Sequence, residues 1–229
     1  MDSSILEKIE ELRKVFDANR NKEDAHHMEA YMKNHFKMYG IKATPRRQLS
    51  KFFIDYCKSY PQSFKVEIAR ILHGYPEREL HHVAQELLGK GYKRNIAEDD
   101  IHWITEFITT NSWWDSVDFV APQLAGAYFL KYPEKRQEIC DEWINSDNIW
   151  LIRSAILFQL KYKERTDLDF LFTIILKTCH IKEFFINKAI GWILRDNSRR
   201  IPEEIKAFVK AHGEKLSPLS KKEALRLLK

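Results

Sequence analysis

A helical unit repeats along the second half of the sequence, and this repeat limits the possible folds more than any other feature. Each copy has an amphipathic segment, a short polar break and a second segment that opens with aromatic residues. Trp114, Trp150 and Phe185 occupy corresponding places in the copies, about 36 and 35 positions apart. A period of this length with two helices per unit is the signature of an α-solenoid, in which each repeat buries its apolar face against its neighbours. We therefore expect an all-α fold, an α-solenoid superhelix of HEAT-like helical repeats.

The composition agrees with long helices joined by short turns. The 229 residues include only 7 Gly and 7 Pro, and no segment shows the apolar–polar alternation of a half-buried strand. Hydrophobic residues make up 44% of the chain, which favours a folded core over disorder. We expect one domain over residues 1–229, with essentially no strand.

Charge and cysteine content narrow the partners and the compartment. The net charge of +5 and the pI near 8.9 indicate, modestly, an anionic partner. Cys57, Cys140 and Cys179 are too widely spaced for a disulfide framework or a metal-ligand pair, so a reducing, cytoplasmic location is expected. The first residues lack a secretory core, and no stretch reaches the roughly 18 apolar residues of a membrane helix. The sequence predicts a soluble protein without a membrane partner.

Capping residues predict where several helices start. Ser112 is expected to cap the helix that carries Trp114, and Thr44 with Pro45 to open a basic helix. Ser220 and Glu223 have the spacing of a capping box before the last helix. Asp115 falls in the first turn after Ser112, where the helix dipole alone explains a carboxylate.

Asp118 lacks that explanation and is the candidate catalytic carboxylate. It lies beyond the first turn, between Val117 and Phe119, and four residues after Trp114, so both project from one helix face. An indole face and a carboxylate together suit a sugar that is becoming cationic. The alternative is an exposed Asp beside a core Trp, and the motif by itself leaves both interpretations open.

The next repeats add two cations at one structural position. Arg153 interrupts an apolar run, so its guanidinium needs an acceptor, either a carboxylate of the protein or a bound phosphate. The corresponding residue of the following repeat is Lys188, which predicts a row of phosphate contacts, although two unrelated salt bridges are the alternative. Trp192 lies one turn after Lys188, where a single Trp is more often part of a core.

The first half of the chain carries further basic and aromatic residues that suit nucleic acid. Candidate DNA contacts are Tyr31, Lys42, Arg46 and Arg47, the last two directly after Thr44-Pro45. A helix start with nearby cations is a ready phosphate site, whereas solvated surface charge is the default interpretation of each residue alone. No metalloprotease, dinucleotide, P-loop or hydrolase-elbow motif is present, and we expect no metal and no organic cofactor.

Five segments together resemble the AlkD family of alkylpurine DNA glycosylases, which has a HEAT-like fold. They span most of the chain in consistent order and are Tyr31–Phe36, Ser112–Asp118, Ser146–Tyr162, Lys182–Arg195 and Leu216–Leu225. The resemblance implies hydrolysis of the N-glycosidic bond of cationic N3- and N7-alkylated purines, such as 3-methyladenine and 7-methylguanine, in duplex DNA. It implies base excision repair without a metal or cofactor, and a duplex held on the concave face without base flipping.

The same resemblance assigns roles to individual residues. It implies that Asp118 is the catalytic carboxylate and that Trp114 and Trp192 pack against the lesion's deoxyribose. It further implies that Arg153 engages the DNA backbone near the lesion and that Tyr31 contacts the DNA.

Two other functions compete with a glycosylase for cationic purines. The first is a non-catalytic HEAT-like module that binds nucleic acid or protein, against which Asp118 argues because a carboxylate opposes DNA binding. The second is a glycosylase for neutral lesions such as uracil, for which the sequence offers no acid–base pocket. A monomer is the default oligomeric state.

Overall fold

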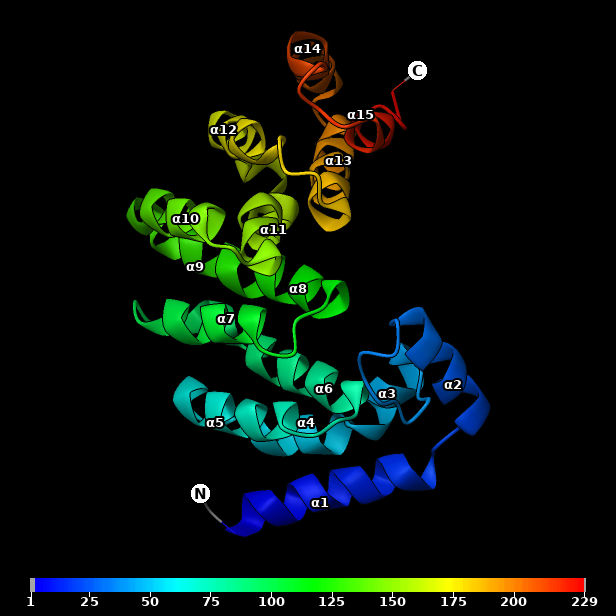
Figure 1. The fold of residues 1–229 in the computed structure, drawn as a ribbon. Helices are drawn as coiled ribbons and strands as arrows, with labels where there is room; N and C mark the ends of the chain where they lie inside the picture. Colours follow the sequence, from blue (N-terminus) through cyan, green and yellow to red (C-terminus); the bar gives the residue numbers. More distant parts are fainter. Residues whose placement is uncertain (1–2, 229) are drawn as a thin grey trace. The chain divides into compact units, whose positions relative to one another are not determined.

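The computed structural model describes residues 3–228, and within this range the chain is built from helices (Figure 1). The prediction of an all-α fold is confirmed. The single β-type pairing among these residues is an isolated bridge between Lys37 and Glu77. None of the described helices combines the length and the apolar character needed to cross a membrane.

The helices group into two compact units, Met1–Asn95 and Ile96–Lys229. The single domain expected over residues 1–229 stays a prediction, and residues 1, 2 and 229 lie outside the described range. The helices of the first unit are α1 (Ser3–Ala18), α2 (Lys22–Tyr31), α3 (Ala43–Leu49), α4 (Lys51–Cys57), α5 (Gln62–His73), α6 (Arg78–Gly89) and the 3-10 turn η1 (Tyr92–Arg94).

The second unit contains the predicted repeats. Its α-helices are α7 (Asp100–Thr109), α8 (Trp114–Val120), α9 (Gly126–Lys131), α10 (Arg136–Asn145), α11 (Ile149–Leu157), α12 (Leu168–Thr178), α13 (Phe184–Ser198), α14 (Pro202–His212) and α15 (Pro218–Ala224). A π-helical turn, η2 (Ala121–Ala125), joins α8 to α9, and short 3-10 turns are η3 (Pro133–Lys135), η4 (Phe158–Lys161) and η5 (Lys163–Arg165).

In the first unit, a buried carboxylate fixes the loop that leads into α3. Glu79 of α6 accepts hydrogen bonds from the backbone N–H groups of Tyr39, Gly40 and Ile41 at 3.0, 2.9 and 3.1 Å. Gly40 has φ +83°, and a Cβ there would lie 2.1 Å from the Asn21 carbonyl oxygen, so only glycine fits. The start of α3 and its basic residues are therefore held by α6.

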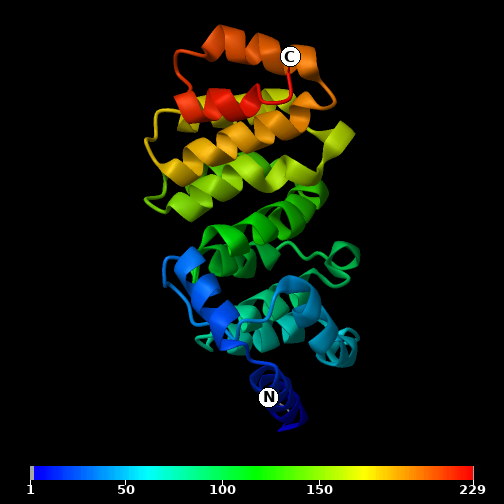
Figure 2. The same cartoon turned by 90° about the vertical axis from the view of Figure 1, so that its right-hand side faces the viewer.

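In the second unit, the helices alternate between two layers. Helices α8, α11, α13 and α15 pack in chain order as one layer, which faces the viewer in Figure 2. Helices α7, α10 and α12 lie on the other side of that layer (Figure 1). Residues that recur with the period of the repeat therefore lie in one row across neighbouring helices of the first layer.

Three predicted helix caps are wrong, each because the helix starts at a different residue. Trp113 caps α8, while the Ser112 hydroxyl donates to the Ile108 carbonyl at the end of α7. Helix α3 starts before Thr44, with Lys42 as the capping residue. Helix α15 is capped by Ser217, which accepts from the Ser220 N–H, and the Ser220 hydroxyl instead donates to the Asn187 carbonyl of α13.

Candidate active site

Helix α8 carries Asp118 on the side that packs against α11, the next helix of the same layer. The helix starts directly after Trp113, whose backbone is extended, and the Ser116 hydroxyl bonds the Trp113 backbone to close the first turn. Val117 is buried, and the Asp118 side chain keeps only 17% of its exposure. A carboxylate in this position needs strong hydrogen-bond donors.

Arg153 of α11 supplies those donors through a two-point ion pair. Its Nε donates to Asp118 Oδ1 at 2.8 Å, and its Nη2 donates to Oδ2 at 2.9 Å. The third nitrogen, Nη1, donates to the backbone carbonyl of Phe185 in α13. The Arg153 side chain is 3% exposed. Of the two acceptors that the sequence left open for this guanidinium, the structure shows the carboxylate, and the predicted contact with a DNA phosphate stays a prediction.

Two opposing effects act on the acidity of Asp118. Burial raises the pKa of this carboxyl above its ordinary value, and the charge of Asp115 adds to the rise. The hydrogen bonds and the charge of Arg153 lower the same pKa, but burial prevails. The site thus holds one carboxylate, largely removed from water and oriented at both oxygens by a single guanidinium.

Three aromatic rings form a cluster at the starts of α8, α11 and α13. Trp113, Trp150 and Phe185 have ring centroids 5.0–5.5 Å apart, so each ring contacts the other two. Trp114 was predicted to be equivalent to Trp150 and Phe185, but Trp113 is the residue that packs with them. Two adjacent tryptophans in the sequence meant that either ring could pack with Trp150 and Phe185. Helix α8 starts at Trp114, and the ring of the capping residue, Trp113, makes these contacts.

Trp114 and Trp192 are both half-buried and belong to the same layer of helices as Asp118. Trp114 is the first residue of α8, one helical turn before Asp118, so the two side chains share a face as predicted. Trp192 lies on α13, one turn after Lys188. Their predicted contacts with a deoxyribose stay predictions.

Lys188 forms an ion pair, as in the alternative of two salt bridges that the sequence left open, but its partner was not predicted. Its Nζ lies 2.7 Å from Oε1 of Glu223, and Arg195 pairs with Oε2 of the same carboxylate. Lys188 remains 39% exposed at its side chain. The signal that could have revealed Glu223 is its spacing, because it follows Lys188 by one period of the repeat.

The other predicted DNA contacts lie in the first unit, and their side chains differ in how exposed they are. Tyr31 is 70% exposed at the end of α2, just before Lys33 and Asn34, which adopt φ of 56° and 58°. Lys42 is exposed and pairs with Asp24 at 2.9 Å. The strained turn after Tyr31 holds an exposed aromatic ring on the surface.

Arg46 and Arg47 differ sharply although they are adjacent. Arg47 is 63% exposed, and its Nε lies 3.0 Å from Glu86. Arg46 is only 8% exposed at its side chain and contacts the same carboxylate at 2.5 Å. Arg46 therefore forms a largely buried ion pair with Glu86, and its predicted contact with a phosphate stays a prediction.

Within residues 3–228, no three His, Cys, Asp or Glu side chains come together in the way a metal ion requires. The three cysteines are free, with Cys57 and Cys140 buried. Burial raises the pKa of both buried thiols, so neither is poised as a thiolate.

Comparison with known proteins agrees with this architecture. A sequence profile of the family described as DNA alkylation repair enzyme matches residues 12–228. The solved structure of a predicted DNA alkylation repair enzyme from Enterococcus faecalis is similar, with a TM-score of 0.82 and 30% identity over 91% of this chain and 96% of that one. The structure of smu.31 from Streptococcus mutans UA159 shares the fold, with a TM-score of 0.60 and 16% identity over 80% and 98% of the two chains.

No curated protein matches the sequence. The family match nevertheless extends over both units and includes every candidate site residue. The chain belongs to the family of DNA alkylation repair enzymes.

Proposed function

We propose that this protein is a DNA glycosylase that hydrolyses the N-glycosidic bond of cationic N3- and N7-alkylated purines in duplex DNA. Membership of the family supports a role in repair of alkylated DNA. The assignment as a glycosylase for cationic purines rests on the Asp118 carboxylate. Arg153 holds this carboxylate at both oxygens, and Asp118 shares its face of α8 with Trp114.

The chemistry asks little of the protein at the leaving group. A purine alkylated at N3 or N7 already carries a positive charge, so it accepts the electron pair of the C1′–N9 bond without protonation. The deoxyribose becomes cationic as that bond breaks, and a water oxygen then bonds to C1′ and loses a proton to solvent. Catalysis therefore needs stabilisation of the developing sugar cation and placement of the water.

Asp118 is suited to both tasks. A carboxylate about 4 Å from the sugar offers on the order of 4 kcal/mol at an effective dielectric near 20, before desolvation is counted. Arg153 offsets part of that attraction, since it balances the charge of Asp118 in the free protein. In exchange it fixes the orientation of both oxygens, so no reorganisation is needed as the sugar cation develops.

The remaining candidate residues have supporting roles in this proposal. Trp114 and Trp192 present aromatic faces to the cationic sugar, whose charge the ring quadrupole attracts. Tyr31, Lys42, Arg47 and Lys188 contact the DNA, and their exposed side chains permit this. Within the first unit, Arg46 and Arg47 share the carboxylate of Glu86, so Arg46 helps to hold the exposed Arg47 in place. The partner is duplex DNA with alkylated bases, bound by a monomer without a cofactor.

A panel of substrates tests the proposal. The purified protein is incubated with duplexes that contain 7-methylguanine, 3-methyladenine or uracil, and free base is measured by chromatography. We expect release of both methylated purines and none of uracil. Release of uracil would indicate a glycosylase for neutral lesions. Binding of all duplexes without any release would indicate the non-catalytic module, in which Asp118 and Arg153 serve as a structural ion pair.

A further inference from the structure

One residue position recurs on each helix of the first layer of the second unit. Asp118 of α8, Arg153 of α11, Lys188 of α13 and Glu223 of α15 follow one another at intervals of 35 residues. The first two form one ion pair and the last two form another. The pair of Asp118 and Arg153 belongs to the proposed active site and Lys188 is a proposed DNA contact, which leaves Glu223 without a role.

Close packing of α15 against α13 places Glu223 between two cations. Gly191 of α13 lies between Lys188 and Arg195 on the same helix face. A Cβ at Gly191 would lie 2.6 Å from the Glu223 Cβ and 3.1 Å from the Ser220 carbonyl oxygen, so the absence of a side chain there admits α15. Glu223, 9% exposed, directs one oxygen to Lys188 and the other to Arg195.

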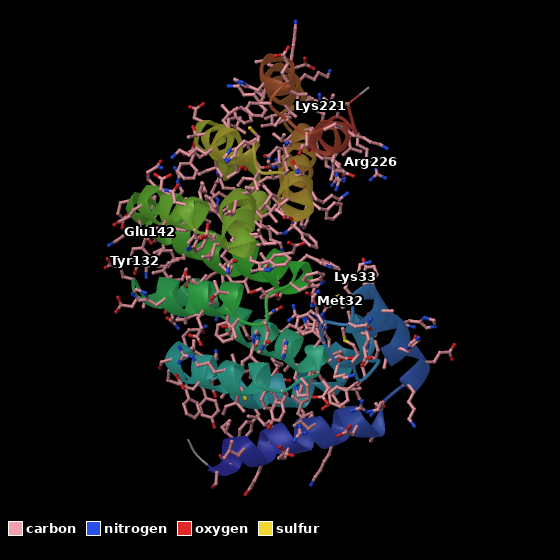
Figure 3. The ribbon with its side chains drawn as sticks, viewed as in Figure 1. Met32, Lys33, Tyr132, Glu142, Lys221 and Arg226 are labelled. Atoms are coloured by element: carbon pink, nitrogen blue, oxygen red, sulfur yellow. The ribbon has the colours of Figure 1, made fainter. Side chains whose placement is uncertain are left out.

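The surroundings of Glu223 hold more positive than negative charge. Arg199 and Arg226 are exposed. The charge of Arg226 acts on both Lys188 and Arg195, and the charge of Arg199 acts on Arg195, where the charge of Asp196 opposes it. Burial lowers the pKa of Lys188, and Arg195 and Arg226 lower it further. Figure 3 shows Arg226, which follows the end of α15, on the side of the second unit opposite to Glu142 of α10. An anion at this end of the layer would balance the excess.

We propose that Glu223 is a positioning residue that holds Lys188 and Arg195 for a phosphate group of the DNA backbone, beyond the lesion itself. The inference rests on the proposed DNA-binding function. Long basic side chains lose conformational freedom when they bind a phosphate, and a carboxylate that already orders them removes part of this cost. Lys188 keeps enough exposure to contact a phosphate while its ion pair with Glu223 remains.

Removal of the Glu223 charge should change the affinity for DNA in the direction opposite to that expected from charge repulsion alone. A carboxylate near the DNA repels phosphate, so removal of its charge should tighten binding if charge alone mattered. If Glu223 positions the two cations, its removal should weaken binding. The variant Glu223→Gln removes the charge and keeps the size. The matched control is Glu142→Gln, which removes the same charge from an exposed residue of the opposite layer.

The experiment measures the Kd of the full chain for an unmodified duplex at several salt concentrations. We expect Glu223→Gln to raise the Kd by roughly three- to tenfold, which is part of the cost of ordering two long side chains. The slope of log Kd against log salt should fall by the amount that roughly one to two phosphate contacts contribute. Glu142→Gln should leave the slope unchanged. Tighter binding by Glu223→Gln than by Glu142→Gln would overturn the proposal, since Glu223 would then be a competitor of the phosphate.

A double-mutant cycle separates positioning from a general loss of structure. In a Lys188→Gln background, Glu223→Gln should raise the Kd less than it does in the wild type, because one of its two targets is gone. An equal effect in both backgrounds would contradict the proposal. Glu223→Asp, which keeps the charge, should restore part of the affinity, and thermal unfolding of each variant reports whether α15 remains packed.

The outcomes for the two proposals are distinct. Duplex binding without base release would contradict the glycosylase function while the test of Glu223 proceeds unchanged. Base release by a Glu223→Gln variant that binds more tightly than the control would contradict only the positioning role. A wild-type protein that does not bind duplex DNA would overturn both.

Discussion

Asp118 and Arg153, from neighbouring helices of one layer, meet through two parallel hydrogen bonds of 2.8 and 2.9 Å. The pair is largely buried, and the guanidinium makes a further bond to the Phe185 carbonyl. Desolvation of both charges offsets much of their attraction, so the pair contributes little net free energy to folding. Its geometry fixes the orientation of both oxygens of one carboxylate, which is what the proposed catalytic role of Asp118 requires.

The variant Arg153→Met should expose the cost of the unpaired carboxylate. Removal of one partner from a buried ion pair leaves a charge without compensation, and we expect a loss of about 3–5 kcal/mol in the free energy of unfolding. The pKa of Asp118 should also rise further, because the interaction that lowers it is lost. Urea unfolding measures the stability. The double variant with Asp118→Leu should regain most of the loss, and its failure to do so would contradict the account.

The two adjacent tryptophans should respond differently to truncation. Trp113 contacts both Trp150 and Phe185, so Trp113→Ala should lower the free energy of unfolding by about 2–4 kcal/mol. Trp114→Ala should cost less stability but should slow base release by about tenfold, through loss of the aromatic face beside the sugar. Chemical unfolding and base release, measured on both variants, test the distinction. Equal stability losses with equal activities would contradict it.

A buried histidine makes the stability of the first unit depend on pH. Burial lowers the pKa of His73 from 6.5 to about 2, with smaller contributions from the charges of His81, Arg78 and His82. His73 therefore takes up a proton near pH 6.5 in the unfolded chain but stays neutral in the folded protein. Its contribution to the free energy of unfolding is fully present above this pH. It declines as pH falls through the window from 6.5 toward 2.

Between pH 7 and 5, we expect this one group to cost about 2 kcal/mol in the free energy of unfolding. His73→Gln should reduce the pH dependence by that amount, as measured by urea unfolding at each pH. His102→Gln is the matched control, since His102 is exposed. If His73→Gln leaves the pH dependence of the wild type intact, the histidine is not held neutral.

The close approach of α13 and α15 depends on Gly191. A Cβ there would lie 2.6 Å from the Glu223 Cβ, so Gly191→Ala must push the helices apart, at an expected cost of about 1–3 kcal/mol. Gly74→Ala is the control, because its new Cβ would come no closer than 3.2 Å to its neighbours, the nearest being the Ile71 carbonyl oxygen. Thermal unfolding of both variants compares them. An unchanged Tm in Gly191→Ala would show that α15 can shift without penalty.

The repeat was the part of the fold that could be predicted most directly. Its period of 35–36 residues predicted helix pairs, and the same period aligns Asp118, Arg153, Lys188 and Glu223 on successive helices. Periodicity works here because each repeat makes the same contact with its neighbour. The division into two units was not predicted, since no change of composition marks Asn95.

Single helix starts and single partners could not be predicted with the same success. Serines at 112 and 220 looked like caps, but the Ser112 hydroxyl donates locally to the Ile108 carbonyl, and the Ser220 hydroxyl donates to the Asn187 carbonyl of another helix. Arg153 had two possible acceptors, and only the packing of α8 against α11 decides for Asp118. Arg46 and Arg47 are alike in sequence, yet the register of α3 buries one and exposes the other.

The most direct test of the account compares the wild type with Asp118→Asn on a duplex that contains 7-methylguanine, with enzyme in excess so that the chemical step is observed. The amide keeps the size of the side chain and removes its charge, and its NH2 group can no longer accept one of the two hydrogen bonds that Arg153 donates. The account predicts rapid base release by the wild type and a rate lower by about a hundred- to a thousandfold in the variant, at equal duplex affinity. Near-equal rates for the two proteins would contradict the role of Asp118 as the catalytic carboxylate.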